Sequence, residues 1–230
     1  MHGEMKCSLL VLHAAVLAVV CSGCSPATPG AKPLDMSAKD HTAAAADHDR
    51  AADANGGERC AGGKADPALS GACWTTGADQ AHRKMADDHR AASQALRDAE
   101  AKACGGLGPS DRDESPFAHR DDVVGVEPLV STITSSKGPT KHVDGASITL
   151  RAVPGLTAEY LQRLVSCHLP RNASRGFARD EMSFCPLAVK GASATVASAS
   201  GGFRVDVRGD GEDAIKEIVR RADALTPHAR

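Results

Sequence analysis

Large apolar side chains are scarce in the first part of this chain, and this limits what that part can fold into. Between residues 25 and 94 there is no Val, Ile, Phe or Tyr, and only five other large apolar residues occur. They are Leu34, Met36, Leu69, Trp74 and Met85. Burying so few side chains does not offset the cost of ordering the backbone, which is about 1–2 kcal/mol per residue. The sequence therefore predicts that this part has no hydrophobic core of its own.

Alanine dominates the same part, so helices are the elements that we expect there. One helix is capped by Ser37 or Asp40 and ends before Asn55, where an Asn-Gly-Gly run follows the alanines. A second helix spans residues 79–104 and ends at the glycine pair 105–106. Two such segments in sequence predict an Ala-rich helical stalk or hairpin that is partly disordered.

The last part of the chain has the composition of a folded domain. Val-rich and alternating stretches after residue 123 predict strands, with a break at Pro128 and a loop over residues 137–145. A helix capped by Thr157 and ended by Pro170 follows.

The remaining elements complete two strand-strand-helix units. A hairpin of strands is expected over residues 194–208, with its turn at 200–202, and an amphipathic helix over residues 212–225. The order ββαββα predicts an α+β domain with a four-stranded sheet and two helices on one of its faces.

These patterns divide the chain into five segments. We expect a signal peptide at 1–23, a flexible linker at 24–36, the helical stalk or hairpin at 37–106, a charged connector at 107–122 and the α+β domain at 123–230.

The cysteines beyond residue 24 are disulfide candidates in an oxidising compartment. Cys60 and Cys73 flank the turn of the expected hairpin and are candidates to pair. Cys167 and Cys185 would pin a long loop to the α+β domain, and Cys104 is left over. An alternative treats Cys167, His168, Met182 and Cys185 as soft ligands for copper or zinc.

Four histidines and a methionine in the Ala-rich part suggest a metal site. His41 and His48 lie seven residues apart, as do His82 and His89, so each pair shares one helix face but is separated by about 10 Å. A fold-back near residue 65 brings His41 level with His89 and His48 level with His82, whereas a turn held by a disulfide brings His48 level with Met85. Either register suits Cu, Zn or Ni, and the alternative is that these side chains are polar surface.

The segment from residue 5 to 24 has one Lys, an apolar run and then small residues, which is the order of a secretory signal. Its end, Cys21-Ser22-Gly23-Cys24, resembles the lipobox of bacterial lipoproteins, although that family usually has Leu where Cys21 stands. The resemblance implies that Cys24 is acylated, that the mature chain is anchored in the cell envelope, and that Ser25 favours the outer membrane, facing the periplasm. Several acyl chains anchor a protein stably.

Composition excludes some functions for this chain. A net charge of -2 and an aromatic content of 3% argue against a nucleic-acid partner. No GxSxG, Walker A, GxGxxG or zincin motif occurs in the sequence. We therefore expect a non-catalytic envelope lipoprotein without a cofactor that binds an envelope protein, or has a structural role, through its α+β domain. The alternatives are a periplasmic Cu- or Zn-binding lipoprotein and an enzyme of unknown type.

Overall fold

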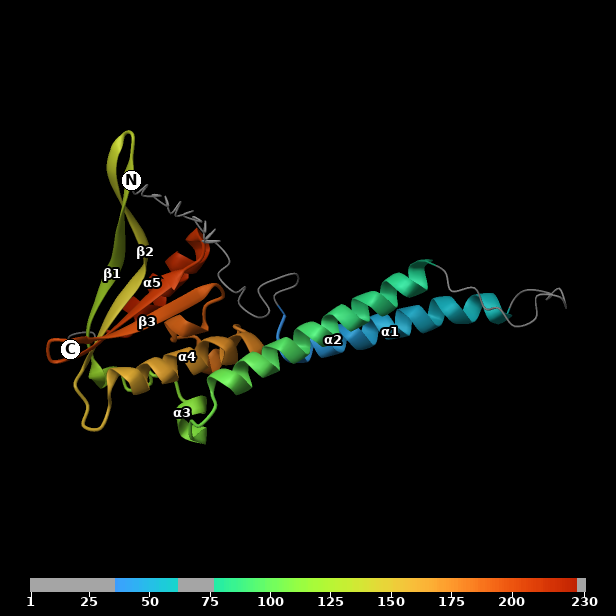
Figure 1. Ribbon diagram of the computed structural model, residues 1–230, viewed down its shortest axis with the longest axis horizontal. Coiled ribbons are helices and arrows are strands. Elements are labelled where there is room, and N and C mark those ends of the chain that lie inside the picture. The colour runs from blue at the N-terminus through green and yellow to red at the C-terminus, as the bar shows by residue number, and fades with distance from the viewer. Residues whose placement is uncertain (1–35, 62–76, 227–230) are drawn as a thin grey trace, which may run out of the picture.

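The computed structural model describes residues 36–61 and 77–226 of the chain. Over these residues it is an α+β structure in which a helical hairpin precedes an antiparallel sheet with helices, as the sequence predicts (Figure 1). The helices and strands are α1 (Ala38–Ala61), α2 (Gly77–Ala103), α3 (Pro109–Asp113), β1 (Val123–Ser135), β2 (Gly138–Arg151), α4 (Ala158–Arg175), β3 (Ala192–Ala199), β4 (Gly202–Gly209) and α5 (Glu212–Asp223).

The four strands form one antiparallel sheet in the order β1-β2-β4-β3. The sheet joins two ββα units, because β2 of the first unit pairs with β4 of the second over residues 145–151 and 202–208. Helix α4 packs on β3, and α5 packs on β2 and β4, so each helix contacts a strand of the other unit. The core between sheet and helices includes Ile148, Leu150, Leu161, Val165, Phe203, Val205, Val207 and Ile218.

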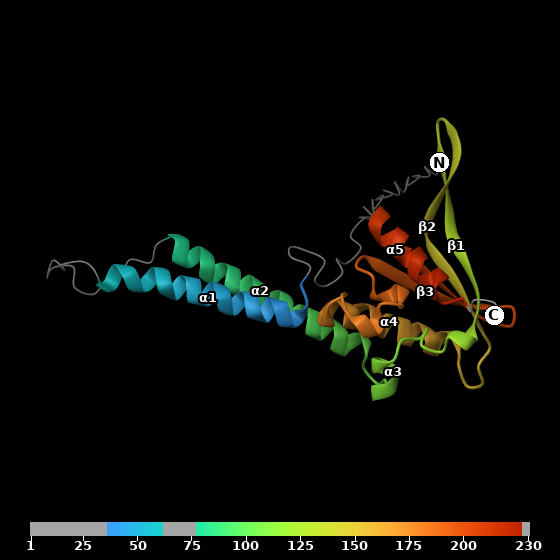
Figure 2. The ribbon, with the colours of Figure 1, turned by 180° about the vertical axis from the view of Figure 1, so that it is seen from behind.

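The β1–β2 hairpin is longer than the sequence suggests and projects beyond the rest of the sheet (Figures 1 and 2). The prediction of a loop over residues 137–145 is wrong, because β2 begins at Gly138 and pairs with β1 from its first residue. The break expected at Pro128 is also wrong, since β1 is an edge strand and half of its N–H groups point away from β2. A bulge leaves Asp144 without a partner residue in β1 between the Leu129–Gly145 and Val130–Val143 pairs.

Helix α4 begins as predicted and ends later than predicted. The Thr157 side chain accepts a hydrogen bond from the Tyr160 N–H and caps the helix. Pro170 does not end it, and the helix continues to Arg175. The last turns hold because they are buried: Asn172 Nδ2 donates to the Leu187 carbonyl oxygen, and Ala173 packs on Leu96 of α2. These contacts outweigh the one backbone hydrogen bond that a proline removes.

The first two helices form an antiparallel hairpin that extends away from the sheet (Figures 1 and 2). Ser37 Oγ accepts from the Asp40 N–H at 3.1 Å, so one of the two predicted caps is present. Helix α1 continues to Ala61 through the Asn55-Gly-Gly run, contrary to the predicted end before Asn55. Such residues cost only about 1 kcal/mol each in a helix, so they weaken it without forbidding it.

The disulfide of the described part joins Cys104 at the end of α2 to Cys167 of α4, with the two Cα atoms 4.6 Å apart. This corrects the predicted pairing of Cys167 with Cys185 and the prediction that Cys104 is left over. Cys185 is a buried free thiol beside Ser115. The reason is orientation, since Cys167 faces the base of the helical hairpin and packs with Leu107 rather than with the loop that carries Cys185. The predicted Cys60–Cys73 pair lies outside the described side chains.

Candidate functional site

Histidines of the two helices of the hairpin face each other in two pairs. The Nδ1 atoms of His41 and His89 are 2.9 Å apart, and those of His48 and His82 are 3.2 Å apart. This is the first of the two registers considered above, in which His41 is level with His89. Met85 is 48% exposed and does not join the buried face of the hairpin, so the structure does not bring it to the histidines as a ligand.

The spacing of small residues explains why these histidines meet. Buried residues of α1 alternate by three and four positions, as in a coiled-coil seam. The same spacing occurs in α2. The seam positions are 38, 41, 45, 48 and 52 in α1 and 79, 82, 86, 89, 93 and 96 in α2, of which His48 and His82 are partly buried and the others buried. Most carry Ala, Ser or His, and this three-four spacing is the sequence signal that places the four histidines, but not Met85, on the facing sides of the two helices.

The two pairs are joined by ring contacts into one continuous row of imidazoles. The ring centroids of His48 and His89 lie 5.4 Å apart with the planes 20° from parallel. The centroids within the pairs lie 5.2 Å and 5.4 Å apart. We call the four residues His41, His89, His48 and His82 the histidine ladder. Among the described residues, no group of three or more His, Cys, Asp or Glu side chains converges closely enough to hold a metal ion in this conformation.

Burial favours uncharged imidazole at the inner end of the ladder. The pKa of His41 is lowered from its usual value, first by burial and then by the neighbouring charge of His89, while Asp40 acts in the opposite direction. Only one ring of each pair can carry a proton between two facing Nδ1 atoms, because the other must accept it. A pair of neutral imidazoles therefore directs at least one lone pair into the space between the helices.

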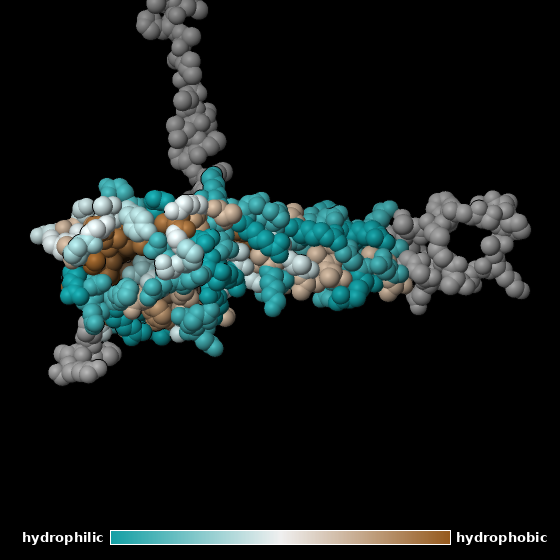
Figure 3. Space-filling view, turned by 90° about the horizontal axis from the view of Figure 1, so that it is seen from below, coloured by the Kyte–Doolittle hydropathy of each residue, from teal (hydrophilic) through white to brown (hydrophobic). Residues whose placement is uncertain are grey.

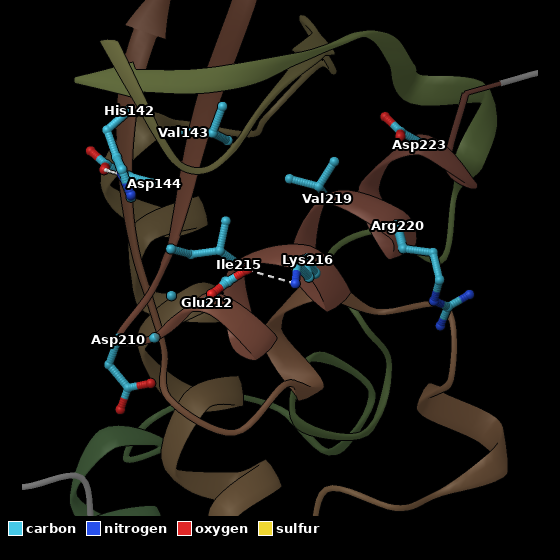
Figure 4. A pocket seen from close by; sticks show the side chains of 12 residues that line it. His142, Val143, Asp144, Asp210, Glu212, Ile215, Lys216, Val219, Arg220 and Asp223 are labelled. Carbon is cyan, nitrogen blue, oxygen red and sulfur yellow. Dashed lines mark hydrogen bonds and ion pairs between the residues drawn. The ribbon is translucent and has the colours of Figure 1, made fainter. Parts of the chain in front are cut away.

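A second candidate site is a groove on the α+β domain, between the β1–β2 hairpin and helix α5. Its volume is about 900 Å³. Figure 4 shows Val143 of β2 and Ile215 and Val219 of α5 pointing into it. We call this the α5 groove. The sequence placed Ile215 and Val219 on the apolar stripe of the last helix, and the structure leaves both only partly buried while Ile218 of the same stripe is fully buried.

Charged side chains surround the apolar floor of the α5 groove. The rim carries four carboxylates, against the cations Lys216 and Arg220. The carboxylates are Asp144, Asp210, Glu212 and Asp223. Lys216 lies 2.7 Å from Glu212, and this hydrogen bond holds the pKa of the Glu212 carboxyl below its usual value. The pKa of Asp144 is lowered mainly by its hydrogen bond with His142. Carboxylates thus outnumber cations around an apolar floor.

The remaining predicted ligands do not form a site in the described residues. Cys167 is in the disulfide, so the soft-ligand set with His168, Met182 and Cys185 loses a thiolate. Burial raises the pKa of the Cys185 thiol, which keeps it protonated and a poor nucleophile. Cys24 and Cys73 lie outside the described residues, and Cys60 lies where no side chain is described.

The hydropathy of the surface differs along the molecule. In Figure 3 apolar residues gather in a hollow over the α+β end, whereas the helical hairpin is mostly hydrophilic. None of the described helices has the length and hydropathy that crossing a bilayer requires.

No family model matches this sequence, and neither a curated protein nor a solved structure matches it.

Proposed function

We propose that this protein is a non-catalytic envelope lipoprotein whose α+β domain binds a protein partner in the α5 groove. The observation that carries the proposal is the exposed apolar floor formed by Val143, Ile215 and Val219. A groove of about 900 Å³ between a projecting hairpin and a helix has the size of a site for a peptide segment or a ligand. Concave sites with an apolar floor and a few polar groups around it are the usual form of ligand-binding sites.

The shape of the groove favours a short segment of another protein as its occupant. One wall is the β1–β2 hairpin, where Val130 lies directly opposite Val143 and is 48% exposed. The partner that fits is a segment with alternating or clustered apolar side chains, which the floor would bury. Because carboxylates outnumber cations on the rim, a segment flanked by Lys or Arg is favoured over an acidic one.

The helical hairpin projects from the α+β domain and does not lie between the domain and the proposed anchor (Figure 1). With 24 residues in α1 and 27 in α2, the hairpin is about 35–40 Å long. The lipobox-like sequence at Cys24 precedes α1 by a Pro/Gly/Ala linker. Because α1 begins beside the α+β domain, where Ala38 packs with Ala173 of α4, an acylated Cys24 would tether the domain through the linker alone, on the periplasmic side of the outer membrane.

Two buried titratable side chains of the α+β domain lie away from the α5 groove. Cys185 is fully buried, and burial raises the pKa of its thiol. His168 is also fully buried, and burial lowers its pKa. Neither side chain reaches the α5 groove, whose lining contains no Cys or Ser.

Site-specific photocrosslinking tests the α5 groove in the intact envelope. A photoreactive residue at Val143 or Val219 is expected to give one crosslinked envelope protein, and the Ile215→Asp substitution is expected to abolish that product. The matched control is a photoreactive residue at Thr149 or Thr195, which lie on the opposite, solvent-facing side of the sheet. Crosslinks of equal yield from both sides, or none from the groove positions, would contradict the proposal.

The anchor is tested by fractionation. The Cys24→Ala substitution is expected to move the protein from the outer-membrane fraction to a soluble or signal-retaining form and to remove a lipid-sized mass from its N-terminal peptide. Cys185→Ala is the control, since a buried thiol in the domain has no part in anchoring. An unchanged membrane fraction for Cys24→Ala would overturn this part of the proposal.

A further inference from the structure

We propose that the histidine ladder is a transition-metal site, in which His41 with His89 and His48 with His82 each chelate one Cu²⁺ or Zn²⁺ ion, with Cu²⁺ bound more tightly. This inference concerns the helical hairpin and stands apart from the α5 groove. It rests on the facing Nδ1 atoms of four side chains that come from two helices.

The separation of the donor atoms matches what one ion requires. Metal–imidazole bonds are about 2.0–2.1 Å long, so two nitrogens on one ion are about 2.9 Å apart at right angles and about 3.3 Å apart in a tetrahedron. The observed Nδ1 separations are 2.9 Å in the His41–His89 pair and 3.2 Å in the His48–His82 pair. An ion can therefore bridge each pair with little movement of the helices.

The chemistry of the donors selects the ions. Neutral imidazole suits Cu²⁺, Zn²⁺ and Ni²⁺, and Cu²⁺ binds a given nitrogen site most tightly among divalent first-row metals. Two imidazoles leave further coordination positions for water, which reaches the His48–His82 pair because both side chains are partly exposed, whereas the His41–His89 pair is buried. The hairpin seam around the ladder is built from Ala and Ser, so no bulky side chain fills the space between the helices.

The ladder would tie the hairpin together across a large sequence separation. His41 and His89 are 48 residues apart, and His48 and His82 are 34 apart. An unfolded chain does not hold these pairs, so an ion bound to them stabilises the folded hairpin by mass action. Apolar burial stabilises the helical hairpin only weakly, because Leu96 is the one large aliphatic side chain among the described buried residues of α1 and α2.

The alternative is that each pair is only a hydrogen bond between imidazoles. Such a pair needs one shared proton and no metal, and it would bind Cu²⁺ no better than a surface histidine. The two readings differ in their response to substitution. For a chelating pair, the loss of either member is as damaging as the loss of both, whereas independent surface ligands contribute separately.

Calorimetry and native mass spectrometry of the full chain with CuCl₂ and ZnCl₂ test this difference. The unsubstituted chain is expected to bind two ions. His89→Gln, His41→Gln and the double variant are each expected to lose the same single ion, with at least a tenfold weaker affinity at that site. His82→Gln and His48→Gln are expected to lose the other ion, and His82→Gln/His89→Gln to lose both. His142→Gln is the matched control, because His142 is exposed and lies on β2, outside the helical hairpin.

Two further readouts keep the test independent of folding. Each variant must keep the helical circular dichroism of the parent. The Cu²⁺ complex of the parent is expected to show paramagnetic resonance splitting from imidazole nitrogens, and His82→Gln/His89→Gln is expected to lack it. The proposal is overturned if the parent binds no ion at micromolar metal, if His82→Gln/His89→Gln binds like the parent, or if any single substitution removes both ions. The last result would mean one shared site instead of two.

Discussion

The Oγ of Ser115 lies 3.1 Å from the Sγ of Cys185, and both residues are buried. Ser115 precedes the core residue Phe117, and Cys185 begins the 3-10 turn that leads to β3. The hydroxyl donates to the sulfur and also accepts from the Phe117 N–H at 3.2 Å. This contact joins the connector to the loop before β3, whereas the disulfide joins the end of α2 to α4.

This proximity predicts that Ser115→Cys creates a disulfide with Cys185. An oxidised S115C chain is expected to lose two hydrogens relative to its reduced form at this position. The new bond would raise the free energy of unfolding by about 3–4 kcal/mol, because it closes a loop of some tens of residues in the unfolded chain. Mass spectrometry and urea unfolding check this, with Ser115→Ala as control. That variant is expected to be about 1 kcal/mol less stable than the parent because it loses the hydrogen bond.

The Cys104–Cys167 disulfide is expected to hold the helical hairpin against α4. Cys104→Ala/Cys167→Ala should lower the free energy of unfolding by about 4 kcal/mol, since the bond links residues 63 apart. Proteolysis is expected to cut α2 faster in this variant than in the parent. The parent should show the same loss of stability in reducing agent. Cys185→Ala is the control and should lose as much stability in reducing agent as the parent does. Equal stability with and without reducing agent would contradict the bond.

Sequence patterning predicted the fold class because its signals are local and strong. The alternation around Ile148, the Thr157 cap and the stripe of the last helix each appear within one element. The prediction of a loop at 137–145 failed because the distal β1–β2 hairpin is exposed on both faces, as at the neighbouring residues Lys141 and His142, so no alternation of burial exists there to read. The predicted helix end at Pro170 failed for a different reason, because tertiary contacts of Asn172 and Ala173 stabilise the helix beyond the proline.

The candidate sites were predictable only in part. Seven-residue spacing of the histidines fixed which helix faces they share, but the choice of register depends on how Ala and Ser pack across the seam. The α5 groove could not be foreseen, since it depends on the length of the β1–β2 hairpin. The cysteine pairing failed because the orientation of Cys167 on α4 is a property of the packed structure, and spacing alone favoured the nearer thiol.

Arg171 is expected to be the strongest polar contact between α4 and the segments before the sheet. Its side chain is 7% exposed, and its guanidinium contacts Glu100 at 2.6 Å and also Asp113. Arg171→Met would leave the largely buried Glu100 carboxylate without this partner, so the free energy of unfolding should fall by about 3 kcal/mol. Adding Glu100→Gln should recover part of the loss.

The control for Arg171 is an exposed ion pair on α2 of the helical hairpin. Lys84 lies 2.8 Å from Asp88, and both side chains are mostly exposed. Lys84→Met should therefore change stability by less than about 1 kcal/mol. Urea unfolding of the three variants measures these differences, and an Arg171→Met chain as stable as the Lys84→Met chain would contradict the assignment.

His168 is expected to make the α+β domain less stable in acid. The side chain is fully buried, Nε2 contacts the Asp111 carbonyl oxygen at 3.2 Å, and burial lowers the pKa of His168 below its usual value of 6.5. Above pH 6.5 both the folded and the unfolded state hold this imidazole neutral. As the pH falls through 6.5 the unfolded state takes up a proton that the folded state does not, so the free energy of unfolding decreases.

Urea unfolding at pH 7.5, 6.5 and 5.5 measures this dependence. Between pH 6.5 and 5.5 the parent is expected to lose up to about 1 kcal/mol through His168. His168→Gln should be less stable than the parent at pH 7.5 but lose less on acidification, so the two curves converge. His119→Gln is the matched control, because the His119 side chain is 74% exposed and its removal should leave the slope unchanged. A slope that is the same in His168→Gln as in the parent would show that another group, such as the buried His41, carries the acid sensitivity.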